Sequence, residues 1–440
     1  MRSRTLLSIL LLLALAGCTG LTPTSEPTSL PPTPTPISPT AVPIPTPEPQ
    51  PMITTLKLWL PEELNPYSDS PGAEILLQQL AEFNRSRKDL QVEVFVKKVH
   101  GRGGMIDYLR IARDAAPSIL PDLIVVGTDD LATMATSNYI QPLDSLLPSA
   151  QAAERFPFAV EMGTVTSQEG DETVTAGFVI GVDMQHLAYR KTPSSSPPIS
   201  WTQVITPPVS FIFPAGGRDL QVNDATLIQY MAAGGKVTDS DGNPFLDERT
   251  LLKVLTFYDD CVGTGAISPT VVLDITTAEQ SWERFKAGEG DIAVVQASHY
   301  WPEVLAGATD GTFIAGSLPT RDGFPFTIAR DAWAAAMVTD DPSRQALAMI
   351  LFDWLTAPEN SAEWTQAAGY LPGTRSALRM WDVPEAEQVA LRDLLDAAIP
   401  APSQEVMAKV GPVMQVAVES VLTGTASPQE AARTAAQSLE

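Results

Sequence analysis

Leu120-Pro121-Asp122-Leu123-Ile124-Val125-Val126-Gly127-Thr128-Asp129-Asp130 is the stretch that decides the fold class of this chain. Its four consecutive apolar residues, 123–126, predict a short strand that is buried on both faces. Pro121-Asp122 leads into the strand, and Gly127-Thr128-Asp129-Asp130 ends it. In α/β sheets the ligand-binding residues follow the carboxyl ends of strands, so Asp129 becomes a candidate binding residue.

Two strand–helix units come before this strand. Residues 56–60 (Leu-Lys-Leu-Trp-Leu) alternate and stop at Pro61, and residues 92–96 (Val-Glu-Val-Phe-Val) form a second alternating run; both predict strands. Apolar residues at helical spacing predict helices over residues 73–85 and 106–115. The order strand, helix, strand, helix, strand indicates a parallel sheet covered on both faces.

A comparable order of strands and helices returns later in the chain. Further strands are predicted at residues 175–190, 291–296 and 332–338. Further helices are predicted at residues 220–234, 247–263, 343–355, 402–422 and 427–438. Two α/β lobes explain this succession better than one sheet of unusual size.

The N-terminal residues predict export and lipid attachment. Two arginines in residues 1–4, an apolar run over residues 6–15 and the sequence Leu15-Ala16-Gly17-Cys18 are typical of a lipoprotein signal peptide, here residues 1–17. The alternative, a signal anchor that stays in the membrane, needs roughly 20 apolar residues, about twice this run. Residues 18–52 then predict a lipidated Cys18 followed by a tether rich in Pro and Thr, or an O-glycosylated stalk with the same mechanical role.

Composition narrows the classes of partner. A formal net charge of −24, from 28 Lys+Arg and 52 Asp+Glu, argues against nucleic acid and against lying flat on an anionic membrane. With Cys18 lipidated, Cys261 has no partner for an intrachain disulfide, and we expect it to be a small buried apolar residue.

Several motifs, in their order along the chain, resemble the extracellular solute-binding proteins of ABC importers, in particular the group-1 class that mostly carries sugars. The motifs that carry this resemblance are Leu120-Pro121-Asp122-Leu123-Ile124, Tyr139-Ile140-Gln141-Pro142-Leu143-Asp144, Gly181-Val182-Asp183, Ser200-Trp201-Thr202, Phe285-Lys286-Ala287-Gly288, Phe352-Asp353-Trp354-Leu355-Thr356-Ala357-Pro358-Glu359-Asn360 and Gly369-Tyr370-Leu371-Pro372. Residues 209–219 lack a clear family pattern, so the resemblance does not identify the substrate.

The resemblance implies an α/β, two-lobed fold like that of periplasmic binding proteins (type II), with a hinge between the lobes. With the division of the chain that the resemblance implies, lobe 1 comprises residues 53–176 plus 319–372, and lobe 2 comprises residues 177–318 plus 373–440. The implied function is capture of a mono- or oligosaccharide and its delivery to ABC permease subunits. We expect a monomer outside the cytoplasm, anchored to the bacterial cell membrane by its lipid, with no cofactor, no metal and no enzymatic activity.

Eight residues are candidate ligand contacts. Sugars need aromatic faces for their C–H surfaces, and the resemblance implies stacking by Trp301 with Tyr300 or His299 beside it, and a contact from Asp129. Carboxylates and aromatic residues at strand ends, at the hinge strand or at the Gly-Tyr-Leu-Pro turn complete the set: Glu62, Glu63, Asp183, Trp333 and Tyr370. For Tyr300 and Trp301 the alternative is a place in the core, and for Asp183 it is a hydrogen bond that holds the hinge. For Glu62 and Glu63 the alternative is a solvated loop, and for Asp129 it is a turn.

Other functions stay open at this stage. A glycoside hydrolase needs two carboxylates, which Glu63 and Asp129 could provide. The acidic loops could favour a polyamine over a sugar, and a surface lipoprotein could bind only proteins. A metal site is disfavoured, because the three histidines show no ligand spacing and Asp239-Ser240-Asp241-Gly242-Asn243 does not match a calcium loop.

Overall fold

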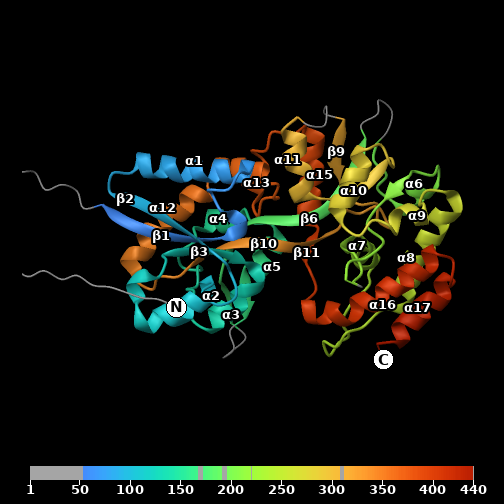
Figure 1. Ribbon diagram of the computed structural model, residues 1–440, viewed down its shortest axis with the longest axis horizontal. Helices are drawn as coiled ribbons and strands as arrows, with labels where there is room; N and C mark the ends of the chain where they lie inside the picture. The colour runs from blue at the N-terminus through green and yellow to red at the C-terminus, as the bar shows by residue number, and fades with distance from the viewer. Residues whose placement is uncertain (1–52, 167–171, 191–195, 220, 308–311, 440) are drawn as a thin grey trace, which may run out of the picture. The chain divides into compact units, whose positions relative to one another are not determined.

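The computed structural model describes residues 53–166, 172–190, 196–219, 221–307 and 312–439 (Figure 1). The predicted signal peptide, Cys18 and the tether lie outside the described residues. Residues 51–440 form one compact unit. Within the described ranges, no helix is both long and apolar enough to cross a membrane.

A mixed sheet runs through this unit, with strand order β2-β1-β3-β10-β6-β8-β7. The strands are β1 (Thr54–Pro61), β2 (Leu90–Lys97), β3 (Leu123–Gly127), β4 (Thr164–Thr166), β5 (Thr173–Thr175), β6 (Phe178–Arg190), β7 (Phe211–Ile212), β8 (Ile292–Gln296), β9 (Phe313–Gly316), β10 (Thr327–Met337) and β11 (Ala398–Pro400). In addition, β9 pairs with β6, β11 pairs with β10, and β4 and β5 pair separately. The first three strands are mutually parallel, as predicted, whereas β10 runs antiparallel to both β3 and β6.

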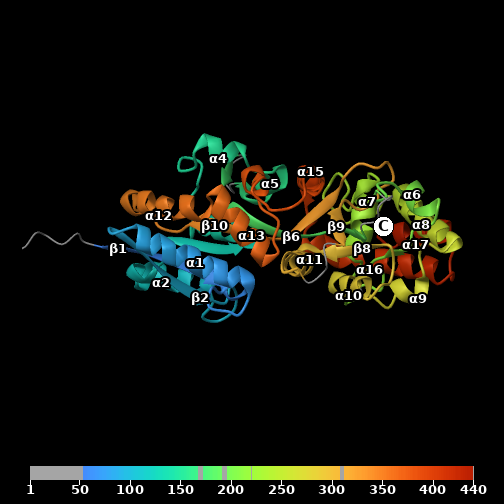
Figure 2. The ribbon, with the colours of Figure 1, turned by 90° about the horizontal axis from the view of Figure 1, so that it is seen from above.

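Helices cover both parts of the sheet (Figures 1 and 2). They are α1 (Pro71–Ser86), α2 (Met105–Ala115), α3 (Leu131–Thr136), α4 (Ser149–Ala153), α5 (Pro157–Met162), α6 (Trp201–Ile205), α7 (Asp224–Ala232), α8 (Glu248–Thr264), α9 (Pro269–Val272), α10 (Ala278–Lys286), α11 (Ala297–Leu305), α12 (Pro342–Leu355), α13 (Pro358–Ala368), α14 (Arg375–Leu378), α15 (Glu385–Asp396), α16 (Gln404–Leu422) and α17 (Pro428–Gln437). Several begin with a side-chain cap, as where Asn223 accepts a hydrogen bond from the Thr226 N–H at the start of α7. These caps satisfy N–H groups that the helix itself leaves unpaired.

The two longest strands, β6 and β10, join the strands of the first lobe (β1–β3) to those of the second lobe (β7–β9). The first half of β6 pairs with β10, and its second half pairs with β8 and β9. This arrangement explains the nearly continuous burial of β6, which is covered on both faces along most of its length.

Apolar side chains form a core in each lobe, and a further cluster, which includes Phe158 and Trp282, extends across the crossing strands. In the first lobe one cluster lies under α1, α12 and α13 and includes Leu58 and Phe352, and a second includes Ile124 and Met134 on the other face of the sheet. The largest cluster belongs to the second lobe, where α8, α16 and α17 pack on one another. Cys261 is fully buried there, in agreement with its predicted role, and forms no disulfide within the described part of the chain.

Two strand predictions differ from the structure in their bounds. The predicted strand at 175–190 begins at Phe178, since Thr175 belongs to β5 and Gly177 lies between the two strands. A Cβ on Gly177 would come within 2.9 Å of the Leu131 side chain. Glycine at this position therefore lets the backbone pack closely against Leu131. Strand β10 begins five residues before the predicted start at residue 332, because residues 327–331 complete the crossing between the lobes.

Candidate ligand-binding site

A polar cavity of about 830 Å³ lies where the crossing strands meet the second lobe. Four helices, α7, α10, α11 and α16, begin at its wall. The side chains that line it are mostly polar or charged: Asp183, Gln185, Pro214, Arg218, Asp219, Gln221, Val222, Asn223, Asp224, Thr276, Thr277, Ala278, Glu279, Gln296, His299, Arg330, Asp331, Gln404, Met407 and Ala408. A concave site of this size with convergent polar groups is typical of small-molecule binding.

Asp183 connects the crossing strand β6 to the start of α11. Its carboxylate accepts a hydrogen bond from the Ser298 N–H at 3.0 Å, and the side chains of Ser298 and Gln296 also hydrogen-bond to it. Burial nevertheless raises the pKa of the Asp183 carboxyl, and the negative charge of Asp331 adds to this effect. Asp183, a sequence-predicted site residue, therefore lies in the wall of the cavity.

Arg330 ties β10 to the N-terminus of α7. Its guanidinium donates to both carboxylate oxygens of Asp224, at 2.9 Å from Nε and 2.5 Å from the terminal nitrogen. Such a bidentate contact fixes the orientation of both side chains. The ion pair leaves the two groups 32% and 21% exposed, so it forms a fixed part of the cavity wall.

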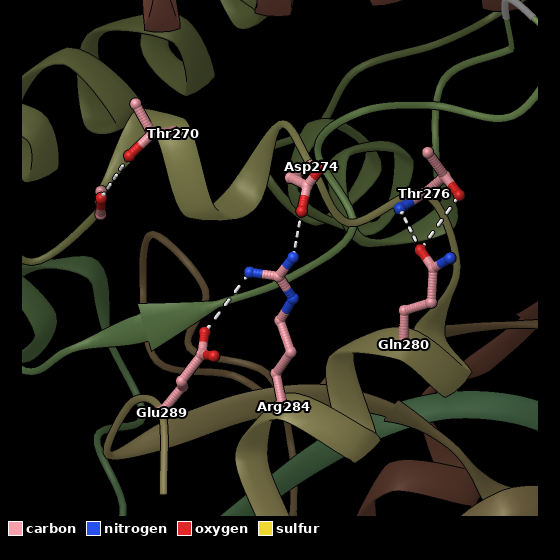
Figure 3. Close-up of polar contacts among 7 residues, drawn as sticks. Thr270, Asp274, Thr276, Gln280, Arg284 and Glu289 are labelled. Atoms are coloured by element: carbon pink, nitrogen blue, oxygen red, sulfur yellow. Dashed lines mark hydrogen bonds and ion pairs between the residues drawn. The ribbon is translucent and has the colours of Figure 1, made fainter. Parts of the chain in front are cut away.

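Residues 276–279 form another part of the wall, and polar contacts hold this segment in place (Figure 3). The Gln280 side-chain oxygen accepts hydrogen bonds from the N–H and the hydroxyl of Thr276, at 2.8 and 3.1 Å. One turn later in α10, Arg284 pairs with Asp274 and with Glu289 (Figure 3). The loop before α10 is thereby attached to the helix that follows it.

Tyr370 and Trp333, two further predicted site residues, lie together next to the crossing strands. Trp333 lies close enough to Tyr370 to lower the pKa of its hydroxyl, and both side chains are half-buried. A Cβ on Gly181 would come within 3.1 Å of the Tyr370 Cβ, so the missing side chain lets the Gly-Tyr-Leu-Pro turn approach β6. Burial raises the pKa of the Tyr370 hydroxyl, and the negative charges of Asp183, Asp331 and Glu63 raise it further. Glu63 therefore lies within electrostatic range of this group.

Tyr300 and Trp301 lie in the core instead of the cavity. Both rings are fully buried in α11, where Tyr300 contacts His186 edge-on and Trp301 contacts Trp381 in the same way. The physical reason is their place on the helix: α11 packs this face against β6 and α13, while Ser298 and His299 face the polar side. Neither ring can stack on a ligand from this position, and we leave both out of the site.

The remaining predicted residues, Glu62 and Asp129, are exposed near the first-lobe side of the crossing. Glu62 lies in a short 3₁₀ turn after β1, and Asp129 lies in another after β3. The negative charge of Asp129 acts on Arg330 and Asp331. The structure thus places Asp129, Asp183, Glu63, Trp333 and Tyr370 around the crossing strands.

Of the residues that line the cavity, only Asp183 was among the eight candidates, and Gln185, Arg330 and Asp331 are three of those that the candidate set missed. Gln185 follows Asp183 by two positions and shares its face of β6, which period-2 alternation could have indicated. Arg330 and Asp331 fall just outside the predicted strand at 332–338, so its late start concealed them. The part of the chain that the structure describes holds no group of three or more His, Cys, Asp or Glu side chains suited to a metal ion.

Most of the chain matches one protein family. Residues 78–390 match the family model described as bacterial extracellular solute-binding protein, which is more than half of the chain. The chain belongs to the bacterial extracellular solute-binding proteins. Its family places it outside the cytoplasm, and no curated protein sequence matches this solute-binding protein.

Solved structures share the fold of this solute-binding protein. The cyclic α-maltosyl-1,6-maltose binding protein from Arthrobacter globiformis matches at 16% identity and a TM-score of 0.64, over 88% of this chain and 98% of the other. The sugar-binding protein MalE from Xanthomonas citri matches at 19% identity and a TM-score of 0.63, over 88% and 96%. A family-1 extracellular solute-binding protein from Alicyclobacillus acidocaldarius matches at 13% identity and a TM-score of 0.65, over 88% and 97%. The predicted two-lobed α/β fold is confirmed.

Proposed function

We propose that this protein captures a mono- or oligosaccharide and delivers it to an ABC permease. The observation that carries the proposal is the cavity at the crossing strands, whose lining is dominated by carboxylates, amides and hydroxyls. Such groups match the hydroxyls of a sugar, which both donate and accept hydrogen bonds. The solved relatives from Arthrobacter globiformis and Xanthomonas citri are described as binding sugars, which supports the same class of ligand here.

The proposed binding site has a part from each lobe. Lobe 1, taken as 53–176 plus 319–372, would supply Asp129, Glu63, Trp333 and Tyr370. Lobe 2, taken as 177–318 plus 373–440, would supply most of the cavity, and Arg330 and Asp331 of lobe 1 would complete its wall. A ligand that contacts both lobes at once binds the closed form better than the open form and therefore shifts the population toward closure.

The proposed location follows from the N-terminal sequence. Residues 1–17 would direct export, Cys18 would carry the lipid, and residues 19–52 would separate the folded unit from the membrane. A net charge of −24 disfavours direct contact of the folded unit with an anionic bilayer, so the lipid would be the attachment. We propose that the protein acts as a monomer.

The proposed role involves binding without chemistry. Catalysis by a pair of carboxylates needs one of them held protonated next to the scissile bond and the other ionised across from it. Glu63 and Asp129, the pair considered from sequence, are both exposed and lie after different strands of the first lobe. Their exposure favours hydroxyl binding over the environment that a general acid needs.

A thermal-shift titration with neutral saccharides tests this function. At about 100 times its dissociation constant, a ligand that binds only the folded state stabilises it by roughly 2.7 kcal/mol. We expect a saturable rise in melting temperature with one saccharide class, and no release of smaller sugars when the mixture is analysed afterwards. A melting temperature unchanged by mono-, di- and oligosaccharides would refute the sugar assignment, and release of shorter sugars would refute the binding-only role.

The Gln185→Ala variant tests whether the saccharide binds in this cavity. Gln185 lines the cavity and is 8% exposed. We expect the saccharide-induced shift to decrease strongly in this variant. A matched control is Gln388→Ala, a glutamine on α15 whose amide contacts Leu378 and Arg379 away from the cavity. Its shift should equal that of the parent protein.

A further inference from the structure

Two carboxylates face each other across the crossing strands. Asp331 of β10 is the register partner of Asp183 of β6, at a point where the pairing shifts between Ala329 and Asp331. Side chains directly opposite in an antiparallel pair share one face of the sheet and lie close together. Like charges in this position destabilise the pair, so its presence in the cavity wall requires an explanation.

No cation of the described residues neutralises this pair directly. The nearest one, Arg330, donates to both oxygens of Asp224. Asp183 accepts a hydrogen bond from the neutral Ser298 N–H, whereas Asp331 is an exposed residue of β10 that has only a longer-range charge interaction with Arg330. Burial raises the pKa of both carboxyls; the positive charge of Arg330 partly offsets this for Asp331, and Ser298 and Gln296 partly offset it for Asp183, while neighbouring carboxylates raise both pKa values further.

The other charged groups of the cavity do not neutralise the two carboxylates either. Five carboxylates line it against two guanidiniums. Arg218, the second guanidinium, is 77% exposed and lies 3.7 Å from Asp219. His299 is 43% exposed and lies 3.9 Å from Glu279 at the rim. Asp129, on the first-lobe side, adds another negative charge within range of Asp331.

A separate observation at the same place points to a ligand. Gln185 lines the cavity two residues after Asp183, on the same face of β6, and is 8% exposed. Its side-chain oxygen is buried and has no hydrogen-bond partner among the described residues. A buried acceptor without a donor is costly, and a donor on the ligand would satisfy it.

We propose that the ligand of this cavity carries a protonated amine, bound between Asp183 and Asp331 with Gln185 as a further acceptor. This inference rests on the proposed function and narrows it from saccharides in general to those that bear an amino group. The groups left unsatisfied here are acceptors, and an ammonium offers three donors and no acceptor, whereas a hydroxyl also needs a donor. An ammonium would also neutralise the two facing carboxylates. The aromatic rings of Trp333 and Tyr370 nearby suit a cation as well.

Calorimetric titration of the whole protein with a matched ligand series tests the proposal. Glucose, glucosamine and N-acetylglucosamine, each as monosaccharide and as β-1,4-linked disaccharide, differ only in a hydroxyl, an ammonium or a neutral amide at C2 of each ring. Spermidine provides an amine without a sugar. We expect the ammonium form to bind about tenfold or more tightly than both neutral forms, as for a charge-assisted hydrogen bond.

Two variants make the test specific. Asp331→Asn removes one charge of the facing pair, and we expect it to abolish the preference for the ammonium form while raising the melting temperature of the ligand-free protein. Asp259→Asn, on the exposed surface of α8, removes the same charge elsewhere and should change neither. A purely structural role for Asp331 would lower the melting temperature without altering the preference.

Each outcome separates this inference from the function on which it rests. A neutral sugar that binds as tightly as its ammonium analogue would overturn the amine site and leave saccharide capture intact. Binding of spermidine alone would keep the amine site and refute the saccharide. Heat changes equal to those of buffer with every ligand would refute both.

Discussion

At the scale of single residues, burial divides the four aromatic candidates into two that lie in the core and two that lie near the cavity. Tyr300 and Trp301 follow a strand, as binding residues often do, but α11 begins directly after β8 and packs both rings into the core. Trp333 and Tyr370, by contrast, stay half-buried beside the cavity carboxylates. Local sequence could place these residues at strand ends, but which side of α11 meets the core depends on β6 and α13, which come from distant parts of the chain.

Tyr300→Phe should leave ligand affinity unchanged. The Tyr300 hydroxyl is buried and finds no hydrogen-bond partner among the described residues, so its removal should be neutral or stabilise the protein by about 1 kcal/mol. Chemical denaturation and calorimetry with a bound saccharide measure the two effects. A tenfold weaker affinity with unchanged stability would mean that Tyr300 contacts the ligand after all.

His186 should make stability depend on pH. This side chain is fully buried, and burial lowers its pKa from 6.5 to about 4. Between these values the unfolded chain binds a proton that the folded chain does not, so stability is lost as the pH falls from about 6.5 to 4. The total loss should be about 3 kcal/mol from this group.

Comparison of the parent protein with His186→Phe isolates this effect. The phenylalanine ring can keep the edge contact to Tyr300, which lies 4.9 Å away between ring centroids. Denaturation at several pH values should show a shallower loss of stability for the variant below pH 6.5. Parallel curves for the two proteins over that window would contradict a buried neutral histidine.

At the scale of elements, the strands and helices were largely predictable, whereas the register of the crossing strands was not. Apolar periodicity indicated α1, α2, α8 and α12 within a few residues. Asp183 and Asp331 lie opposite each other because the strand register shifts next to them, and the two residues are almost 150 positions apart in the sequence. Local sequence patterns cannot predict such a register. Helix α7 also begins later than predicted, because Asn223 provides its cap.

The ion pair between β10 and α7 should contribute measurably to stability. Arg330→Ala leaves the partly buried Asp224 carboxylate without its partner, and we expect a loss of about 1–2 kcal/mol in the free energy of unfolding. Arg392→Ala removes a more exposed pair with Asp393 and should cost little. Equal losses in the two variants would show that the Arg330 contact is no stronger than an ordinary surface pair.

At the scale of the whole molecule, the chain combines a proposed lipid tether with a two-lobed unit whose cavity lies at the lobe crossing. The family assignment rests on residues 78–390, and the fold is shared with solved structures despite identities below 20%. The order of motifs along the sequence predicted this fold. The ligand could not be predicted in the same way, because the side chains that form the cavity come from six separate segments of the chain.

Replacing Cys18 should release the protein from the membrane. In the proposed lipoprotein, Cys18→Ala removes the thiol that carries the lipid, and the tether cannot hold the protein at a bilayer by itself. Fractionation of cells that express the parent and the variant measures this. The parent should sediment with membranes and the variant should not, whereas membrane retention of both would refute lipid attachment at Cys18.

A crystal structure of the protein with the saccharide that gives the largest thermal shift is the most direct test. We expect ligand density in the cavity at the crossing strands, in contact with Asp183, Gln185 and Asp331, and facing Trp333 or Tyr370 from the first lobe. Density elsewhere, with this cavity filled only by solvent, would contradict the proposed site.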